Sequence, residues 1–249
     1  MNLKSVLVLM IGLFAVPAVF AQVFTPPAEG FSRKKNAFIT LEDGTQIVGK
    51  IKKIKRISKF AVFSNITVLD SLSGEKISLP AEKIKNMYLP PSELANFARA
   101  SEFMSDVRNW DEEKREEYKE LTEGYAYFEK TEFLSKRKDI EKNKEGKIVL
   151  VQLVNPTFCE KIKVYHNPST QEQGGFQAGG LTVGGYSGDQ SYFLKKGKDP
   201  AFVSSYIKYT NKEFNYLFGD CPEIVKKFEG KTKWADLADA IYSYETECE

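Results

Sequence analysis

The side chains best suited to catalysis are few in this sequence. It holds a single histidine, His166, and so lacks the paired imidazoles of most zinc sites and of di-iron carboxylate sites. A nucleophile–histidine–acid triad needs only one histidine, but no G-x-S-x-G turn is present to carry a serine. The residues therefore predict no catalytic group, no metal ligand and no cofactor.

Carboxylates, in contrast, are abundant, with 34 Asp and Glu residues. A glycosidase needs only two carboxyl groups, about 5 to 9.5 Å apart, beside the bond that it cleaves. No pair stands out by its spacing, and no calcium-binding D-x-[DN]-x-[DN]-G pattern occurs. A secreted hydrolase that acts on glycan through an Asp/Glu pair is thus the alternative to a non-catalytic protein.

Glycines crowd the stretch 174–188, which contains seven of them. A phosphate-binding loop would follow a strand, precede a helix and carry a G-x-G-x-x-G or G-K-[ST] motif. Here an aromatic strand follows instead, so the glycines indicate turns, bulges or close strand approach. The alternative is a flexible binding loop that carries Phe176 and Gln177.

The three cysteines, Cys159, Cys221 and Cys248, are an odd number, so one must stay free or pair with another chain. Cys221 and Cys248 bracket a segment with helical spacing that is expected to turn back near Gly230. Such a turn would bring the two cysteines together. We expect a Cys221–Cys248 disulfide and a reduced Cys159, and the competing pairing is Cys159 with Cys221.

Positive charge is concentrated between Arg33 and Lys59, where nine Lys or Arg residues are set against two acids. One interpretation is a contact with anionic lipid or glycan, and the simpler one is a solvated strand face. The candidate contact residues are Lys50, Lys52, Lys53, Lys55 and Arg56.

Residues 1–21 have the pattern of a secretory signal peptide. Lys4 supplies the positive start, Val6 to Val16 is an unbroken apolar run, and Val19 and Ala21 place small residues before the cut. The apolar run of 11 residues is too short for a transmembrane helix, which needs about 20. We expect cleavage after Ala21 and a mature protein in the periplasm or outside the cell.

The composition fits a folded, β-rich chain, with 42% hydrophobic and 13% aromatic residues. A net charge of +2 is close to balance, so the overall charge points to no polyanionic partner. Export separates the protein from nucleic acid. The partner stays unknown, with an envelope protein, a lipid or a glycan as the options.

Alternating apolar residues predict five short strands between residues 36 and 90. The segment Ile39-x-Leu41-x-Asp43-Gly44-x-x-Ile47-x-Gly49-x-Ile51 resembles the first half of an Sm-type RNA-binding barrel. The second half of that pattern, an Ile-Arg-Gly segment, has no counterpart here. The resemblance therefore implies a small SH3-like barrel and no RNA binding.

A second region, from about residue 125, is expected to form six strands and then two or three helices. It resembles uncharacterised exported proteins of Bacteroidetes-type bacteria. The resemblance implies an envelope or secreted location and a β-rich core with a helical tail, and it implies no activity. It rests on Leu153-Val154-Asn155-Pro156-x-Phe158, Lys163-Val164-Tyr165-x-Asn167-Pro168, Ser191-Tyr192-Phe193 and Leu217-Phe218-Gly219-Asp220-Cys221-Pro222.

Together these patterns predict an α+β fold. Its expected parts are a signal peptide (1–21), an extended leader (22–35), a small SH3-like β-barrel (36–90), a charged helical linker (91–123) and a β-rich domain with C-terminal helices (124–249). The expected function is that of an exported envelope protein, a non-catalytic binding or structural module.

Overall fold

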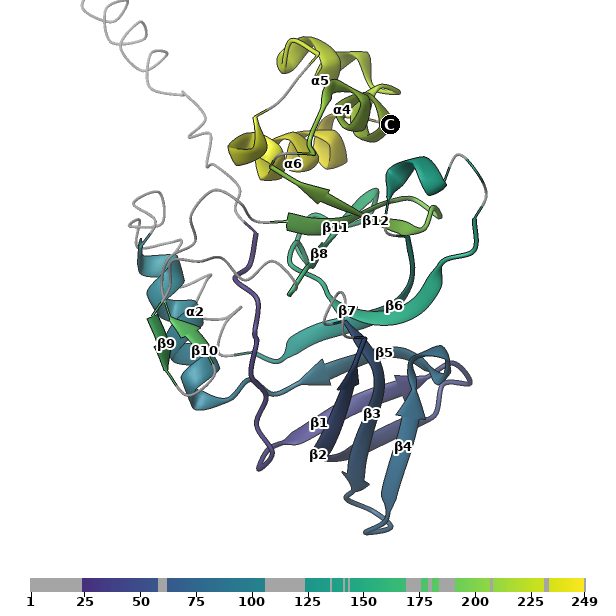
Figure 1. Ribbon diagram of the computed structural model, residues 1–249, viewed down its shortest axis with the longest axis vertical. Helices are drawn as coiled ribbons and strands as arrows, with labels where there is room; N and C mark the ends of the chain where they lie inside the picture. Colours follow the sequence, from purple (N-terminus) through teal and green to yellow (C-terminus); the bar gives the residue numbers. More distant parts are fainter. Residues whose placement is uncertain are drawn as a thin grey trace, which may run out of the picture.

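The computed structural model (Figure 1) describes residues 24–57, 62–105, 124–134, 136–140, 142, 144–168, 176–178, 181–183, 191–206, 208–230 and 233–248. The expected signal peptide and its cleavage site lie outside these residues. Within them, no helix has the length and apolar character that a membrane crossing requires.

The first five strands form an antiparallel unit around a short turn of 3-10 helix. β1 (Asn36–Leu41) pairs with β2 (Gln46–Arg56), β2 pairs with β3 (Phe63–Asp70), and β3 pairs with β4 (Lys76–Pro80). The 3-10 turn η1 (Ala81–Lys83) then leads into β5 (Ile84–Leu89), which pairs with β1. The five strands predicted between residues 36 and 90 are therefore present.

Two further strands close the barrel. β6 (Ala126–Leu134) pairs with β5, β7 (Lys147–Gln152) pairs with β6, and Phe63 of β3 is opposite Leu150 of β7. The result is a closed barrel of six strands in the order β1-β2-β3-β7-β6-β5. The expected five-stranded barrel is thus incomplete by itself, because Phe128 and Leu150 from beyond the linker complete its core.

Two glycines show why the chain bends as it does here. Gly44 has a φ of +86° in the β1–β2 turn, where Asp43 Oδ1 accepts the backbone N–H of Thr45 at 2.9 Å. At Gly49, a Cβ atom would lie 2.4 Å from the carbonyl oxygen of Leu69 on β3. Only glycine lets β2 and β3 approach this closely, so Gly49 serves barrel closure.

The second half of the sheet continues from β6. β12 (Ala201–Ser205) runs parallel to β6, β11 (Ser191–Lys196) pairs with β12, and β8 (Ile162–His166) pairs with β11. An isolated bridge between Leu153 and Tyr165 brings β8 back to the end of β7. The hydrogen bonding of one ten-stranded sheet therefore crosses the expected linker.

The linker itself contains one described helix, α2 (Glu93–Ser105), which begins after Ser92, whose Oγ accepts the N–H of Ala95 at 3.1 Å. A separate two-stranded sheet of β9 (Phe176–Ala178) and β10 (Leu181–Val183) lies beside this helix (Figure 1). In the β6–β7 connection the chain forms the 3-10 turn η3 (Arg137–Asp139).

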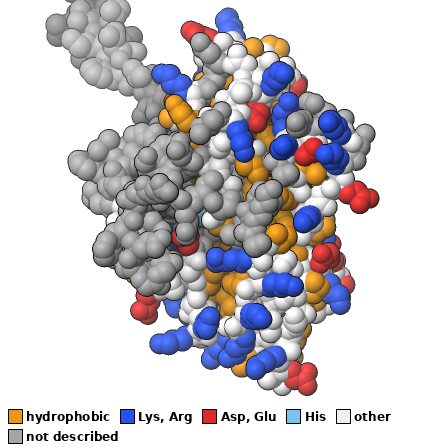
Figure 2. Space-filling view, in the orientation of Figure 1, with side chains coloured by type: hydrophobic (Ala, Val, Ile, Leu, Met, Phe, Trp, Pro, Cys, Tyr) orange, Lys and Arg blue, Asp and Glu red, His pale blue; other side chains and the backbone are white. Residues whose placement is uncertain are grey.

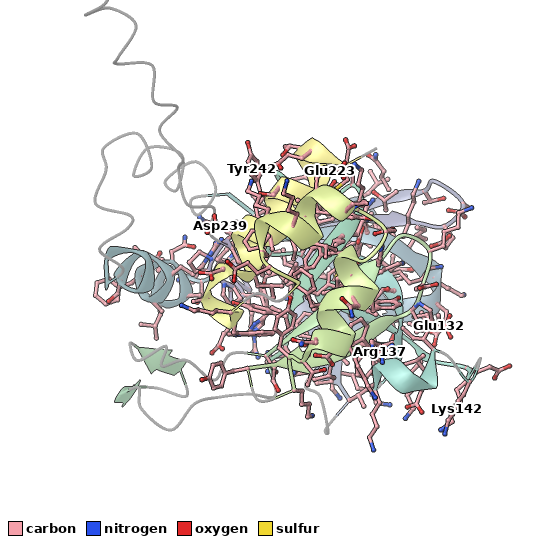
Figure 3. The ribbon with its side chains drawn as sticks, turned by 90° about the horizontal axis from the view of Figure 1, so that it is seen from above. Glu132, Arg137, Lys142, Glu223, Asp239 and Tyr242 are labelled. Carbon is pink, nitrogen blue, oxygen red and sulfur yellow. A yellow bond between two sulfur atoms is a disulfide. The ribbon has the colours of Figure 1, made fainter. Side chains whose placement is uncertain are left out.

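Three helices cover the side of β8, β11 and β12 that is turned away from the barrel (Figures 1 and 3). They are α4 (Asn211–Phe218), α5 (Pro222–Lys227) and, after the 3-10 turn η4 (Trp234–Asp236), α6 (Leu237–Glu247). Phe214, Leu217, Phe218 and Ile241 pack there against Phe202 of β12. Figure 3, which looks down on this helical layer, shows Glu223 of α5 and Tyr242 of α6 on it, with Arg137 and Lys142 of the β6–β7 connection to one side.

A disulfide joins the start of α5 to the end of α6. The Cα atoms of Cys221 and Cys248 are 5.9 Å apart, and 27 positions separate them in the sequence. This is the pairing that the sequence predicts, and Cys159 is free.

The N-terminal segment, predicted as an extended leader, is packed along the molecule from Phe24 onward. The Phe31 ring lies 5.9 Å from Phe63 and 5.6 Å from Phe128, against the barrel core. Phe24 stacks at 6.1 Å on Phe158 in the other half. The apolar residues at positions 24, 28 and 31 have partners in the two core clusters, and these contacts hold the segment against the molecule.

Candidate functional site

A β-bulge in β2 turns four lysines to the outside of the barrel. Ile51 and Ile54 of β2 both contact the core. Two residues of β2 lie between them, whereas the partner strand β3 has only one residue, Thr67, over the same stretch. The bulge accommodates the extra residue, so Lys53 does not point into the core as strict alternation would require. The exposed residues, named here the lysine face, are Lys50, Lys52, Lys53 and Lys55.

Neutral polar groups surround the lysine face. Thr67 is opposite Lys53, Asn65 is opposite Lys55, and Ser78 of β4 donates a hydrogen bond to Asn65 Oδ1 at 3.1 Å. Within the described part of the chain, none of the four lysines is in an ion pair. Figure 2 shows Lys and Arg side chains gathered over the barrel. The charge of this face is therefore available to a partner.

Two acids of the β1–β2 and β3–β4 turns are engaged locally. Asp43 accepts a hydrogen bond from the N–H of Thr45, and Asp70 Oδ2 accepts the N–H of Ser73 at 2.9 Å. These backbone hydrogen bonds lower the pKa of both carboxyl groups. The two acids stabilise turns rather than the lysines.

Arg56, the fifth candidate, has different contacts. Its guanidinium carbon lies 5.4 Å from the centre of the Phe63 ring, and Nη2 donates to the carbonyl of Glu29 at 3.5 Å. A shift in register separates Arg56 from Lys55. The structure thus brings the four lysines together and assigns Arg56 to the packing of the N-terminal segment.

His166, the only histidine, belongs to the same corner of the molecule. Its Nε2 lies 3.8 Å from Glu29 Oε1 and has no hydrogen-bond partner among the described residues. Burial, together with the positive charge of Arg56, lowers the pKa of His166 to about 3. Burial raises the pKa of Glu29. His166 is therefore a neutral, packed side chain at physiological pH.

A second polar cluster lies between the barrel and β8. Lys163 Nζ donates to both carboxylate oxygens of Glu129, at 2.8 and 2.9 Å, and the Tyr165 hydroxyl donates to Oε1 at 2.5 Å. Burial and then the charge of Glu129 raise the pKa of Tyr165, and they raise the pKa of Tyr127 to about 12. Both hydroxyls stay protonated as donors, and the Glu129 carboxylate is already saturated with partners.

Two nucleophilic side chains, Cys159 and Lys195, lie beside this cluster, and only the thiol is held in its unreactive form. Burial raises the pKa of the Cys159 thiol, which donates weakly to the carbonyl of Pro156 at 3.5 Å. A protonated thiol is a poor nucleophile. Burial lowers the pKa of Lys195, whose Nζ lies 3.4 Å from Thr131 Oγ1.

The hydrolase alternative requires two suitably placed carboxyl groups. Glu29 and Glu213 both have a pKa raised by burial, as a general acid needs. Glu29 contacts the His166 corner, whereas Glu213 accepts a hydrogen bond from Ser204 Oγ at 3.1 Å beneath α4. In the described part of the chain their contacts lie in different places, one at the His166 corner and the other under α4, so they do not form a pair.

Comparisons with known protein families, with curated proteins and with solved structures find no match to this chain. Its function is therefore argued from its own surfaces.

Sequence reasoning missed the Glu129 cluster. Glu129 and Lys163 lie 34 positions apart, on strands that are not sequence neighbours. A signal was present, since Glu129 directly follows the apolar residues 126–128 of β6, and Lys163 stands between Ile162 and Val164 in β8. Polar residues on strands with two buried sides must find partners, but the pairing depends on the topology.

Proposed function

We propose that this protein is an exported, non-catalytic binding module whose lysine face binds phosphate or carboxylate groups of the cell envelope. The observation that carries the proposal is the bulge in β2, which exposes four lysines side by side among neutral neighbours. A row of unpaired ammonium groups attracts an anionic polymer or surface by charge and releases its counterions.

Export is the second part of the proposal. It is supported by the signal-like residues 1–21 and by the resemblance of residues 125–249 to exported proteins of Bacteroidetes-type bacteria. The Cys221–Cys248 disulfide is in keeping with this location, because disulfides persist in oxidising compartments. We place the mature protein in the periplasm or outside the cell.

The barrel is proposed to be an SH3-like unit extended by two strands. In support, β1 to β4 form a meander, η1 follows β4, and β5 returns to pair with β1. β6 and β7 are then the addition that closes the barrel and joins it to the other half.

The test is retention of the full chain on an acidic polysaccharide matrix, and separately on vesicles of phosphatidylglycerol with phosphatidylcholine. Retention should fall steeply as salt rises, because exposed charges are screened over about 8 Å at 0.15 M salt. Changing Lys50, Lys52, Lys53 and Lys55 to Gln should remove most of it. Binding to the matrix but not to vesicles would identify a glycan, and the reverse a lipid.

A matched control keeps the change in net charge the same. Lys198, Lys208, Lys212 and Lys226 are exposed lysines of the other half. Their replacement by Gln should leave retention within about twofold of the unchanged chain, since each surface acts locally at this salt. Equal losses in both variants, or no retention of the unchanged chain at low salt, would refute the proposal.

A further inference from the structure

Aromatic rings stand in a row on the outer face of the barrel. Phe38 of β1 is opposite Tyr88 of β5, and Tyr88 is opposite Tyr127 of β6, with the two tyrosine rings 5.1 Å apart. Tyr125, two residues before Tyr127, adds a ring 5.4 Å from Phe38. Neighbouring strands are about 4.8 Å apart, so Phe38 to Tyr127 spans roughly 10 Å. These four residues are named here the aromatic row.

Three of the four rings of the aromatic row are exposed, and the fourth, Tyr127, is half-buried at one end of the row. Phe38, Tyr88 and Tyr125 are 44%, 45% and 38% exposed, whereas the inward neighbours Ile39 and Met87 are buried. Cross-strand aromatic pairs stabilise a sheet by about 0.2 to 1 kcal/mol. This small gain in stability does not explain why several large rings lie together on one open face. Exposed apolar patches of this kind are typical of interaction surfaces.

A row of hydrogen-bonding groups runs beside the rings. Two residues further along the same strands, Thr40 is opposite Asn86 and Asn86 is opposite Glu129. The repeat of a strand places this polar row about 7 Å from the aromatic row, on the same face. In the part of the chain that the structure describes, the side chains of Thr40 and Asn86 form no hydrogen bond with the protein. The polar row therefore offers the Thr40 hydroxyl and the Asn86 amide, and it ends at Glu129, which Lys163 and Tyr165 already engage.

We propose that the aromatic row and the polar row together bind a glycan chain. A pyranose ring has a face of C–H groups, which packs on the electron-rich face of an aromatic ring, and a rim of hydroxyls that need donors and acceptors. Successive sugars repeat at about 5 Å, close to the strand spacing that separates Phe38, Tyr88 and Tyr127. The aromatic row supplies the stacking contacts, and the polar row beside it supplies the hydrogen bonds.

Two other occupants fit this face less well. A peptide that added a strand would need a free sheet edge, but β1, β5 and β6 are each paired on both sides. A lipid acyl chain would have to lie beside the Glu129–Lys163 ion pair, and its burial would desolvate those charges. A sugar hydroxyl, in contrast, can hydrogen-bond to Thr40 and Asn86, which an acyl chain would leave without a partner.

This site deepens the proposed binding function but uses residues other than the lysine face. Its test therefore employs neutral oligosaccharides, which the lysines do not attract. The full chain is titrated in 0.5 M NaCl with hexamers of β-1,4-glucose, β-1,3-glucose, β-1,4-xylose, β-1,4-mannose and β-1,4-N-acetylglucosamine. We expect at least one hexamer to bind, and changing all four lysines of the lysine face to Gln to leave that binding unchanged.

Substitutions then assign the binding to the two rows. Tyr88→Ala should weaken it about tenfold or more, whereas Tyr88→Phe keeps the ring and should change it less than about threefold. Asn86→Ala should weaken it roughly threefold to tenfold, for the lost hydrogen bonds. Tyr206→Ala and Phe97→Ala, at rings that are 58% and 64% exposed elsewhere, are the matched controls.

The proposal is overturned if no hexamer binds at millimolar concentration. It is equally overturned if Tyr88→Ala binds as the unchanged chain does, or if the controls lose as much as Tyr88→Ala. Retention on acidic matrix without binding of any neutral hexamer would leave the lysine face standing and remove the glycan site.

Discussion

In the barrel, β1, β2 and β5 bury one side of each strand and leave the other open, whereas β8, β11 and β12 are covered on both sides. One side of these three strands packs on β6 and β7 through Tyr165, Phe193 and Ala201. The other side packs under α4, α5 and α6. The barrel keeps an outer face of lysines and aromatic rings, and the C-terminal half uses its surfaces for packing.

This difference between an open and a covered set of strands assigns ligand binding and fold stability to different parts of one sheet. A residue on the open face of the barrel can change without disturbing the core, so selection for a ligand is free to act there. A residue of β8 or β11 has neighbours above and below, and its replacement disturbs both layers.

The first prediction compares a buried ring with an exposed one. Phe193 is fully buried and lies 4.8 Å from the Phe133 ring between the layers, whereas Phe38 is 44% exposed. Phe193→Ala should lower the free energy of unfolding by about 3 to 5 kcal/mol, because it leaves a cavity. Phe38→Ala should lower it by about 1 kcal/mol or less. Urea denaturation of both variants measures the difference, and similar losses would contradict it.

The second prediction concerns the disulfide. Replacing Cys221 and Cys248 by Ala should lower the free energy of unfolding by about 3 to 4 kcal/mol, since the bridge closes a loop of 27 positions. Hydrogen exchange should become faster in α5 and α6, while the amides of β1 and β2 keep their protection at low denaturant. Cys159→Ala is the control, and it should change neither measurement by more than the experimental error.

How much of this fold the sequence predicts depends on how local each signal is. The Asp43–Gly44 turn, the Ser92 cap and the helical spacing of Phe214, Leu217 and Phe218 each involve residues a few positions apart, and all are present in the structure. The closure of the barrel is not local, because it depends on Phe63 meeting Leu150. A pattern of alternation shows that a strand exists and not which strand it joins.

The candidate site shows the same limit. The lysines were visible as a charged run, and the pair Ile51 and Ile54 broke the period of two in a way that indicates a bulge. The aromatic row was not visible, since Phe38, Tyr88 and Tyr127 are each an ordinary strand residue until the register aligns them. Arg56 is charged like its neighbours, and its contacts with Phe63 and with the Glu29 carbonyl separate it from them.

The third prediction uses pH to probe the corner where the two halves meet. His166 has a folded-state pKa of about 3, well below its ordinary value of about 6.5. Below pH 6.5, His166 becomes protonated in the unfolded chain but stays neutral in the folded chain, so the free energy of unfolding decreases. The loss should approach about 1.4 kcal/mol per pH unit between roughly pH 6 and pH 4. His166→Gln should flatten this part of the stability profile.

Glu29 provides the internal check on that result. Its pKa is raised by burial, so the folded chain binds its proton more readily than the unfolded chain does. This contribution stabilises the fold as pH falls and opposes that of His166. Glu29→Gln should therefore steepen the acid loss. If His166→Gln and the unchanged chain have parallel profiles above pH 5, His166 is not buried in its neutral form.

The last and smallest prediction contrasts two lysines. Lys161 Nζ donates to the carbonyl oxygens of Tyr244, Glu245 and Cys248 at the end of α6, where a cation also meets the negative end of the helix dipole. Lys161→Gln should lower the free energy of unfolding by about 1 kcal/mol. Lys53→Gln on the lysine face should change it by less than about 0.5 kcal/mol, because Lys53 is exposed and in no ion pair of the described structure. Thermal and urea unfolding of the two variants measure the two losses.

A loss of stability at Lys53 as large as that at Lys161 would mean that the lysine face stabilises the barrel. The division between an open binding face and a packed C-terminal half would then fail.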